Sequence, residues 1–155
     1  MFSDADGAGP REEILLTPEL DLDAAYQLSF DWQTSQTAFS AKTLYDLQVR
    51  IVTNDDIANA ETIFSIQNPE DLKESGVTNF VGWQTQSSKL DLSEWKGQKV
   101  KIAFVYKMLT TNSNSVSLDN VLVKQFTAAT TPVGKLNLTS YDYGKMYLGE
   151  KFYTK

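Results

Sequence analysis

The residues that could do chemistry in this chain are acids, hydroxyls and amides, because its 155 residues include neither histidine nor cysteine. It therefore lacks a thiolate nucleophile, an imidazole base, a disulfide and a Cys/His zinc site. With 20 acidic residues, two carboxylates at the spacing of a glycosidase site are expected by chance. Such a pair is therefore no sign of catalysis. Asp55-Asp56 and Asp21/Asp23 are therefore interpreted as solvated turns. No catalytic sequence motif is present. We predict that the protein is not an enzyme, with a glycoside hydrolase-like activity as the remaining catalytic alternative.

Charge and hydropathy exclude two further classes of function. The 14 basic and 20 acidic residues give a net charge of −6, which repels a phosphate backbone, so we expect no nucleic-acid partner. No stretch of 18 apolar residues exists, so we expect no membrane insertion. The first seven residues lack the basic and apolar regions of a signal peptide. The chain is then either cytoplasmic as written or a piece of an exported protein.

The elements that must position any site are β-strands. Apolar and polar side chains alternate in residues 27–32, 45–51 and 100–107. Each segment can therefore bury one face and expose the other to solvent. Such alternation is typical of antiparallel sheets. Shorter strands are expected at residues 13–17, 62–67, 84–90 and 116–124. These short strands predict an all-β fold, an antiparallel two-sheet β-sandwich of the jelly-roll kind.

The last of these strands contains an irregularity. Val116 and Leu118 are apolar at even positions, whereas Val121 and Val123 are apolar at odd positions. One inserted residue near Asp119-Asn120 would let all four face the core, which predicts a β-bulge there. The alternative is a strand that is buried on both faces.

The connections between strands are predicted from caps and composition. Residues 68–76 carry a cap residue, a proline, early acids and a final glycine, which predicts one short surface helix. Residues 93–97 are expected to form a single helical turn. A jelly-roll domain is predicted over residues 1–126. Residues 127–155 read as a linker and an aromatic tail, either an extra hairpin or the start of another domain.

Four segments in sequence carry a family resemblance. An acidic pair, an apolar strand, Thr-Pro and Leu-Asp-Leu occupy residues 12–22, and the next strand follows at 28–32. Residues 90–104 contain Asp-Leu-Ser-Glu-Trp-Lys-Gly and end in Ile-Ala-Phe, and 117–123 contain Asp-Asn-Val. Together these segments resemble the choice-of-anchor J and cleaved-adhesin group of β-sandwich domains.

The resemblance implies a galactose-binding-like or MAM-like jelly roll. Such domains are secreted or attached to the cell surface, commonly in Bacteroidetes, and serve adhesion or carbohydrate binding. It implies an extracytoplasmic module of a larger surface protein, with any signal peptide removed or outside this chain. Its partners would be a glycan or a host or surface protein, and neighbouring domains of the same polypeptide. The alternative is a structural spacer domain without its own ligand.

The resemblance also implies a metal site. Several related sandwiches hold a structural Ca²⁺ between an early acidic residue and an acid on the final strand. Glu12 or Glu13 and Asp119 match those positions, and carboxylates are the oxygen ligands that Ca²⁺ prefers. The alternative is that Asp119 caps the bulge and the glutamates are solvated.

Sugar binding needs an exposed aromatic face and planar polar side chains. Trp32 continues an apolar strand face, and Trp83 and Trp95 match aromatic positions of the resembled group, so all three are expected to be structural. The polar loops 34–43 and 107–115 are expected to be exposed, and exposed loops often carry binding residues. We therefore predict ligand-binding residues in these loops: Phe39, Asn112 and Asn114.

Overall fold

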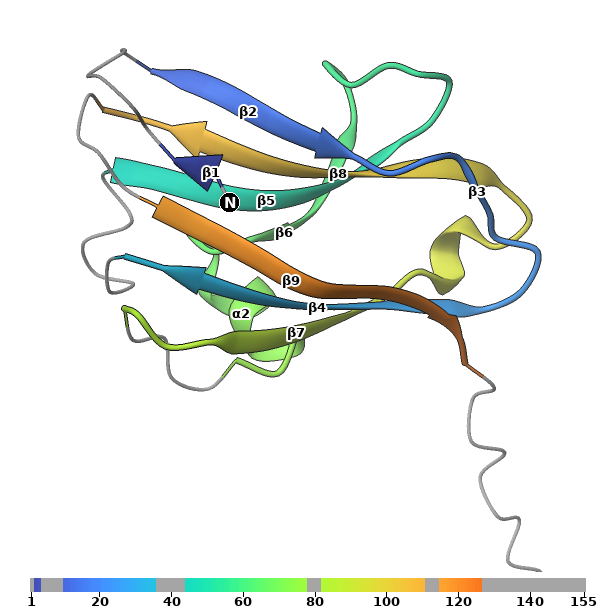
Figure 1. Cartoon of the computed structure of the whole chain (residues 1–155). Helices are drawn as coiled ribbons and strands as arrows, with labels where there is room; N and C mark the ends of the chain where they lie inside the picture. The colour runs from blue at the N-terminus through green and yellow to red at the C-terminus, as the bar shows by residue number, and fades with distance from the viewer. Residues whose placement is uncertain (1, 4–9, 36–43, 78–81, 111–114, 127–155) are drawn as a thin grey trace, which may run out of the picture.

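The computed structural model describes residues 2–3, 10–35, 44–77, 82–110 and 115–126. These residues form a sandwich of two antiparallel sheets (Figure 1). One sheet has the strand order β1 (Phe2–Ser3), β9 (Ser115–Gln125), β4 (Tyr26–Thr34) and β7 (Gln86–Asp91). The other has the order β2 (Arg11–Leu16), β8 (Lys99–Met108), β5 (Tyr45–Val52) and β6 (Glu61–Ser65), with β3 (Leu20–Asp21) paired to β8. The predicted fold class is confirmed.

The core lies between the sheets and is built by the alternation seen in the sequence. Along β4 the buried residues alternate with half-buried ones, and the same occurs in the middle of β5. The ring of Phe30 on β4 meets Phe64 on β6 and Phe104 on β8 edge to face, with centroids 5.5 and 5.4 Å apart. These contacts join the sheets, and truncation of such a buried phenylalanine costs about 3–5 kcal/mol.

The predicted bulge in β9 is confirmed. Ser29 pairs with Leu122 and Asp31 pairs with Asp119, so β9 holds one residue more than β4 between the two pairs. Asn120 has a φ of 51°, a left-handed conformation that asparagine tolerates better than most residues. Val121, however, is 41% exposed. Val121 lies on the same strand face as Val123 but, unlike Val123, does not pack against the core.

The predicted helix and helical turn are also confirmed. Helix α2 (Pro69–Glu74) begins after Asn68, whose side chain accepts a hydrogen bond from the backbone N–H of Glu70. A 3-10 turn, η1 (Ser93–Trp95), buries Trp95. In the part of the chain that the structure describes, no helix has the length and apolar character needed to cross a bilayer.

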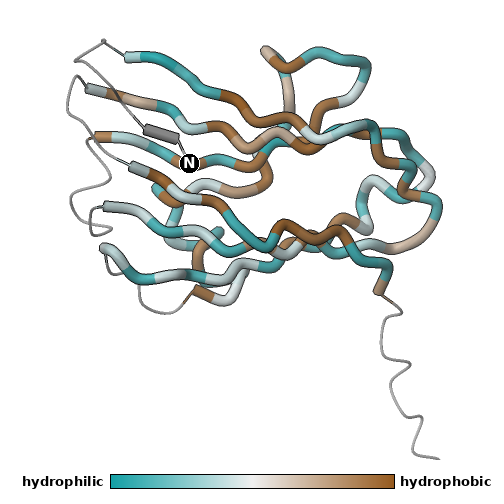
Figure 2. The backbone as a smooth tube through the Cα atoms, in the orientation of Figure 1, coloured by the Kyte–Doolittle hydropathy of each residue, from teal (hydrophilic) through white to brown (hydrophobic). Residues whose placement is uncertain are grey.

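Strand β2 lies at one edge of its sheet. Its apolar run Ile14, Leu15 and Leu16 pairs with β8 but remains exposed. Figure 2 shows this hydrophobic stretch on β2 and a second one on the later half of β9.

Candidate functional site

A polar hollow of about 240 Å³ lies on the outward face of the four-stranded sheet. It spans β9, β4 and the residues leading into β7, with the buried Trp32 beneath it. We call it the bulge hollow, and its polar lining consists of Asp31, Gln33, Thr85, Ser117, Asp119 and Asn120.

Strand register brings these side chains together. Cross-strand partners point to the same face, so Asp31 stands beside Asp119, and Gln33 beside Ser117. The extra residue of the bulge carries Asn120 to the outward face, where its Nδ2 donates to Asp31 Oδ2 over 2.7 Å. Hydroxyl, amide and carboxylate groups from separate parts of the chain thus converge.

The carboxylate of Asp31 is held by neutral groups. It accepts hydrogen bonds from the Asn120 amide and from Ser87 Oγ, the latter at 2.5 Å. These two bonds lower the pKa of Asp31 below its ordinary value of 3.8, so this carboxyl is ionised at neutral pH. Among the described residues, neither Asp31 nor Asp119 forms an ion pair with a lysine or arginine.

Trp83 is 68% exposed and lies two residues before Thr85, which lines the bulge hollow. Its backbone N–H donates to the carbonyl of Thr34, the residue after Gln33, at 2.8 Å. The φ of Trp83 is 61°, a left-handed conformation that costs a non-glycine residue about 1–2 kcal/mol. The expectation of a structural role is therefore wrong for Trp83, whereas Trp32 and Trp95 are buried as predicted.

The predicted ligand-binding residues Phe39, Asn112 and Asn114 lie outside the described residues and stay a prediction. The residues next to those loops are described. Ser35 precedes the segment 36–43 and Ser115 follows 111–114, and they share two hydrogen bonds: Ser35 N–H to the Ser115 carbonyl at 3.0 Å, and Ser115 N–H to Ser35 Oγ at 3.2 Å. These strand ends adjoin Thr34, the partner of Trp83.

The predicted calcium ligands are not brought together. Glu12 lies on β2 of the five-stranded sheet, where it pairs with Arg50 at 3.0 Å and Lys107 at 3.6 Å. Glu13 pairs with Arg11 at 2.8 Å, whereas Asp119 lies in the bulge hollow of the other sheet. Within the described segments, no three acidic residues form a group that could hold a metal ion. Calcium binding stays a prediction from the resemblance.

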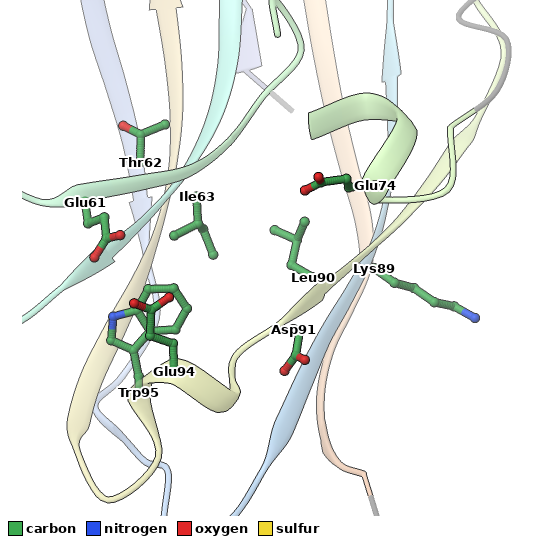
Figure 3. A pocket seen from close by; sticks show the side chains of 9 residues that line it. All are labelled: Glu61, Thr62, Ile63, Glu74, Lys89, Leu90, Asp91, Glu94 and Trp95. Atoms are coloured by element: carbon green, nitrogen blue, oxygen red, sulfur yellow. The ribbon is translucent and has the colours of Figure 1, made fainter. Parts of the chain in front are cut away.

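A second pocket, of about 350 Å³, opens between β6 and β7 at one side of the sandwich (Figure 3). Its apolar lining is Ile63, Leu90 and Trp95, and Trp95 is only 8% exposed. Figure 3 shows the Lys89 side chain extending away from the other labelled side chains. The rest of the lining is Thr62 and four acids: Glu61, Glu74, Asp91 and Glu94. This pocket offers carboxylates over an apolar floor, without an exposed aromatic ring.

Two carboxyl groups with a raised pKa lie elsewhere. Burial raises the pKa of Asp46 and of Asp71 above the ordinary value. Both groups bind Ser65: its Oγ donates to Asp46 at 2.8 Å, and its backbone N–H donates to Asp71 at 2.9 Å. Neither group lines the pocket of Figure 3. Together they join β5, β6 and α2, which is a structural arrangement.

A third hollow, of about 720 Å³, lies on the outward face of the five-stranded sheet. One wall is charged, with Glu12 between Arg50 and Lys107. The other wall contains Ile14 and the segment 57–60. Arg50 also donates to Gln48 Oε1 through Nε at 2.9 Å and Nη2 at 2.6 Å. Its guanidinium is thus occupied within the protein.

Comparison with known proteins finds likeness at the level of structure. No protein-family model matches the chain, and no curated protein matches it. A solved structure titled "CBM4 structure and function" is similar with a TM-score of 0.46 and 12% identity, covering 76% of this chain and 78% of that chain. A likeness of this size identifies neither a family nor a ligand.

Proposed function

We propose that the protein is a non-catalytic carbohydrate-binding module and that the bulge hollow with Trp83 is its binding site. The supporting observation is a tryptophan that is 68% exposed and whose backbone bonds to Thr34, next to a hollow lined by amides, hydroxyls and carboxylates. An aromatic face covers the C–H surface of a sugar ring, and planar polar side chains bind its hydroxyls.

The charge of the hollow favours a neutral glycan. Asp31 and Asp119 lie side by side without a cationic partner among the described residues. Carboxylates accept hydrogen bonds from sugar hydroxyls but repel sulfate and uronate groups. We therefore expect a neutral hexose chain to bind better than its acidic counterpart.

The ionised state of Asp31 does not fit the general acid of a glycosidase. A glycosidase needs one protonated carboxyl group to act as the general acid. The lowered pKa of Asp31 keeps this group ionised, and its two hydrogen bonds fix it in place. In a larger extracytoplasmic surface protein, such a module would hold the protein on a glycan, which is an adhesive role.

The test is isothermal titration of the full chain with neutral and acidic oligosaccharides of matched length. The variant Trp83→Ala is expected to lose at least tenfold in affinity for any glycan that the parent chain binds. Leu15→Ala is the matched control, because Leu15 is also exposed but lies on the other sheet, and it should bind like the parent chain.

Two outcomes would contradict the proposal. The first is equal binding by the parent chain and the Trp83→Ala variant, which would place the site elsewhere. The second is failure of the parent chain to bind any oligosaccharide of the panel. That result would favour the spacer domain instead.

A further inference from the structure

The pocket between β6 and β7 is separate from the proposed carbohydrate site. It has a volume of about 350 Å³ and lies where the edge strands of the two sheets come together (Figure 3). Its floor is apolar, because Leu90 pairs with the core residue Leu28 and Ile63 packs against the core. Trp95, which is 8% exposed, completes this floor.

Four carboxylates from four elements surround the floor. Glu61 on β6 pairs with the core residue Ile51, so its side chain lies on the inner face of the sheet. Glu74 comes from the end of α2, Asp91 from the end of β7, and Glu94 from η1. The carboxylates therefore approach the pocket from separate directions.

The negative charge of the pocket is not neutralised by its surroundings. Within the described ranges, none of these four acids forms an ion pair. Lys89 also lines the pocket, but Figure 3 shows its side chain extending away from the others. Carboxylates around an apolar floor favour a ligand that combines a cation with a hydrocarbon part.

The indole of Trp95 adds a hydrogen-bond donor to the pocket. More than nine-tenths of this residue is buried. No described residue accepts a hydrogen bond from its ring N–H, and this N–H is not among the atoms that are sealed from solvent. Figure 3 shows the ring among the lining side chains, with its nitrogen on the Glu61 side. A complementary ligand therefore brings a hydrogen-bond acceptor as well as a cation.

We propose that this pocket binds a lysine side chain of a partner polypeptide. The lysine methylenes would lie on Ile63, Leu90 and Trp95, and the ammonium would donate to the surrounding carboxylates. A backbone carbonyl of the partner would accept the hydrogen bond from the Trp95 N–H. The volume of about 350 Å³ is at the small end of the range for ligand pockets, about 300–1,000 Å³, which suits a single side chain.

Other cations fit the pocket less well. An arginine presents a planar fork that suits one carboxylate, whereas the three donors of an ammonium suit acids on separate elements. A free alkylamine carries no acceptor for the Trp95 N–H. An amino sugar carries acceptors, but its ammonium is attached directly to the ring, without a methylene stem to cross the apolar floor.

The test is a titration of the ¹⁵N-labelled full chain with an acetylated, amidated peptide of four alanines around one lysine. The indole N–H signal of Trp95 should shift, whereas that of Trp83 should stay in place. The same peptide with Nε-acetyl-lysine keeps the stem but lacks the charge, and should bind at least tenfold more weakly. Pentylamine keeps the stem and the charge but lacks the acceptor, and should bind at least threefold more weakly.

Two glutamates of α2 provide matched variants. Glu74 lines the pocket, whereas Glu70 lies outside the lining and pairs with Lys73 at 3.8 Å. Glu74→Gln should weaken binding of the lysine peptide at least threefold, and Glu70→Gln should leave it unchanged. The double variant Glu61→Gln/Glu94→Gln should weaken it at least tenfold. All four side chains are exposed, so each variant should keep its Tm within about 2 °C of the parent chain.

Four results would overturn the proposal. The first is a lysine peptide that leaves the Trp95 signal unmoved, and the second is equal binding by the acetyl-lysine peptide. The third is equal affinity of Glu74→Gln and Glu70→Gln for the lysine peptide. The fourth is tighter binding of pentylamine or glucosamine than of the peptide, which would assign the pocket to a free amine or to an amino sugar.

Discussion

The two outward faces of the sandwich use their charges differently. On the five-stranded sheet, Glu12 pairs with Arg50 and Lys107, and Lys101 pairs with Asp55. On the four-stranded sheet, Asp31 is held only by an amide and a hydroxyl. The first face satisfies its charges within the protein, whereas the second keeps carboxylates available beside an exposed tryptophan.

The two faces separate polar groups that stabilise the fold from polar groups that can bind a ligand. A charge that is paired on its own sheet contributes to stability, and its removal leaves a partner unsatisfied. A polar group that faces solvent without a charged partner contributes little to stability and remains free to bind a ligand.

The largest effect is expected for Trp83→Ala, which should weaken glycan binding by about 2–3 kcal/mol, as loss of a central aromatic contact does. Trp83→Gly should lose the same affinity but unfold with about 1 kcal/mol more stability than Trp83→Ala, because glycine relieves the left-handed φ of 61°. Titration calorimetry and urea unfolding measure the two quantities. Equal stability of the two variants would contradict the backbone strain that we infer at Trp83.

On the opposite face, Arg50→Met should destabilise the fold by about 1–2 kcal/mol at pH 7, because Glu12 and Gln48 both lose a hydrogen-bond donor. The glycan affinity should not change. Arg50 is the main cause of the lowered pKa of Glu12. That stabilisation is present above pH 4.5, the ordinary pKa, and is lost as the pH falls through the lower folded pKa. Urea unfolding at pH 7 and pH 3 should therefore show a smaller difference between variant and parent at pH 3.

A smaller effect is expected for Asp31→Asn, which should reduce glycan affinity threefold to tenfold, or about 1 kcal/mol. The substitution weakens acceptance from sugar hydroxyls and disturbs the bonds from Asn120 and Ser87. Acidic oligosaccharides should be rejected less strongly by this variant than by the parent chain. Unchanged discrimination between neutral and acidic glycans would remove Asp31 from the site.

The smallest effect is expected for Lys107→Met. The ion pair of Lys107 with Glu12 spans 3.6 Å, and the Lys107 side chain is substantially exposed. Such surface pairs contribute about 0–1 kcal/mol. Urea unfolding should therefore place this variant within about 0.5 kcal/mol of the parent chain, and a loss as large as that of Arg50→Met would show that the two cations contribute equally.

The strands could be predicted because period-two alternation is a local property. Residues 27–32, 45–51 and 100–107 lie within β4, β5 and β8, and the parity change located the bulge. The apolar run of β2 is exposed because it lies at a sheet edge, and edge position depends on the order of strands. Sequence spacing alone does not contain that order.

The candidate site was harder to predict because strand pairing brings its residues together, and sequence spacing alone does not contain that pairing. The alternation placed Asp31 on a polar strand face, but only the register brings Asn120 and Asp119 to it. Trp83 was taken as structural because it precedes a strand at a position that is aromatic in the resembled group. It is 68% exposed instead, on a left-handed backbone that follows Gly82 and bonds to Thr34. A tryptophan directly after a glycine was the one available signal.

The most direct test of carbohydrate binding at Trp83 is a titration of the ¹⁵N-labelled chain with a neutral oligosaccharide, followed through the three indole N–H signals. The signal of Trp83 should shift on binding. That of Trp95, which is buried and does not line the hollow, should stay in place. A bound glycan that leaves the Trp83 signal unmoved would contradict the proposed site.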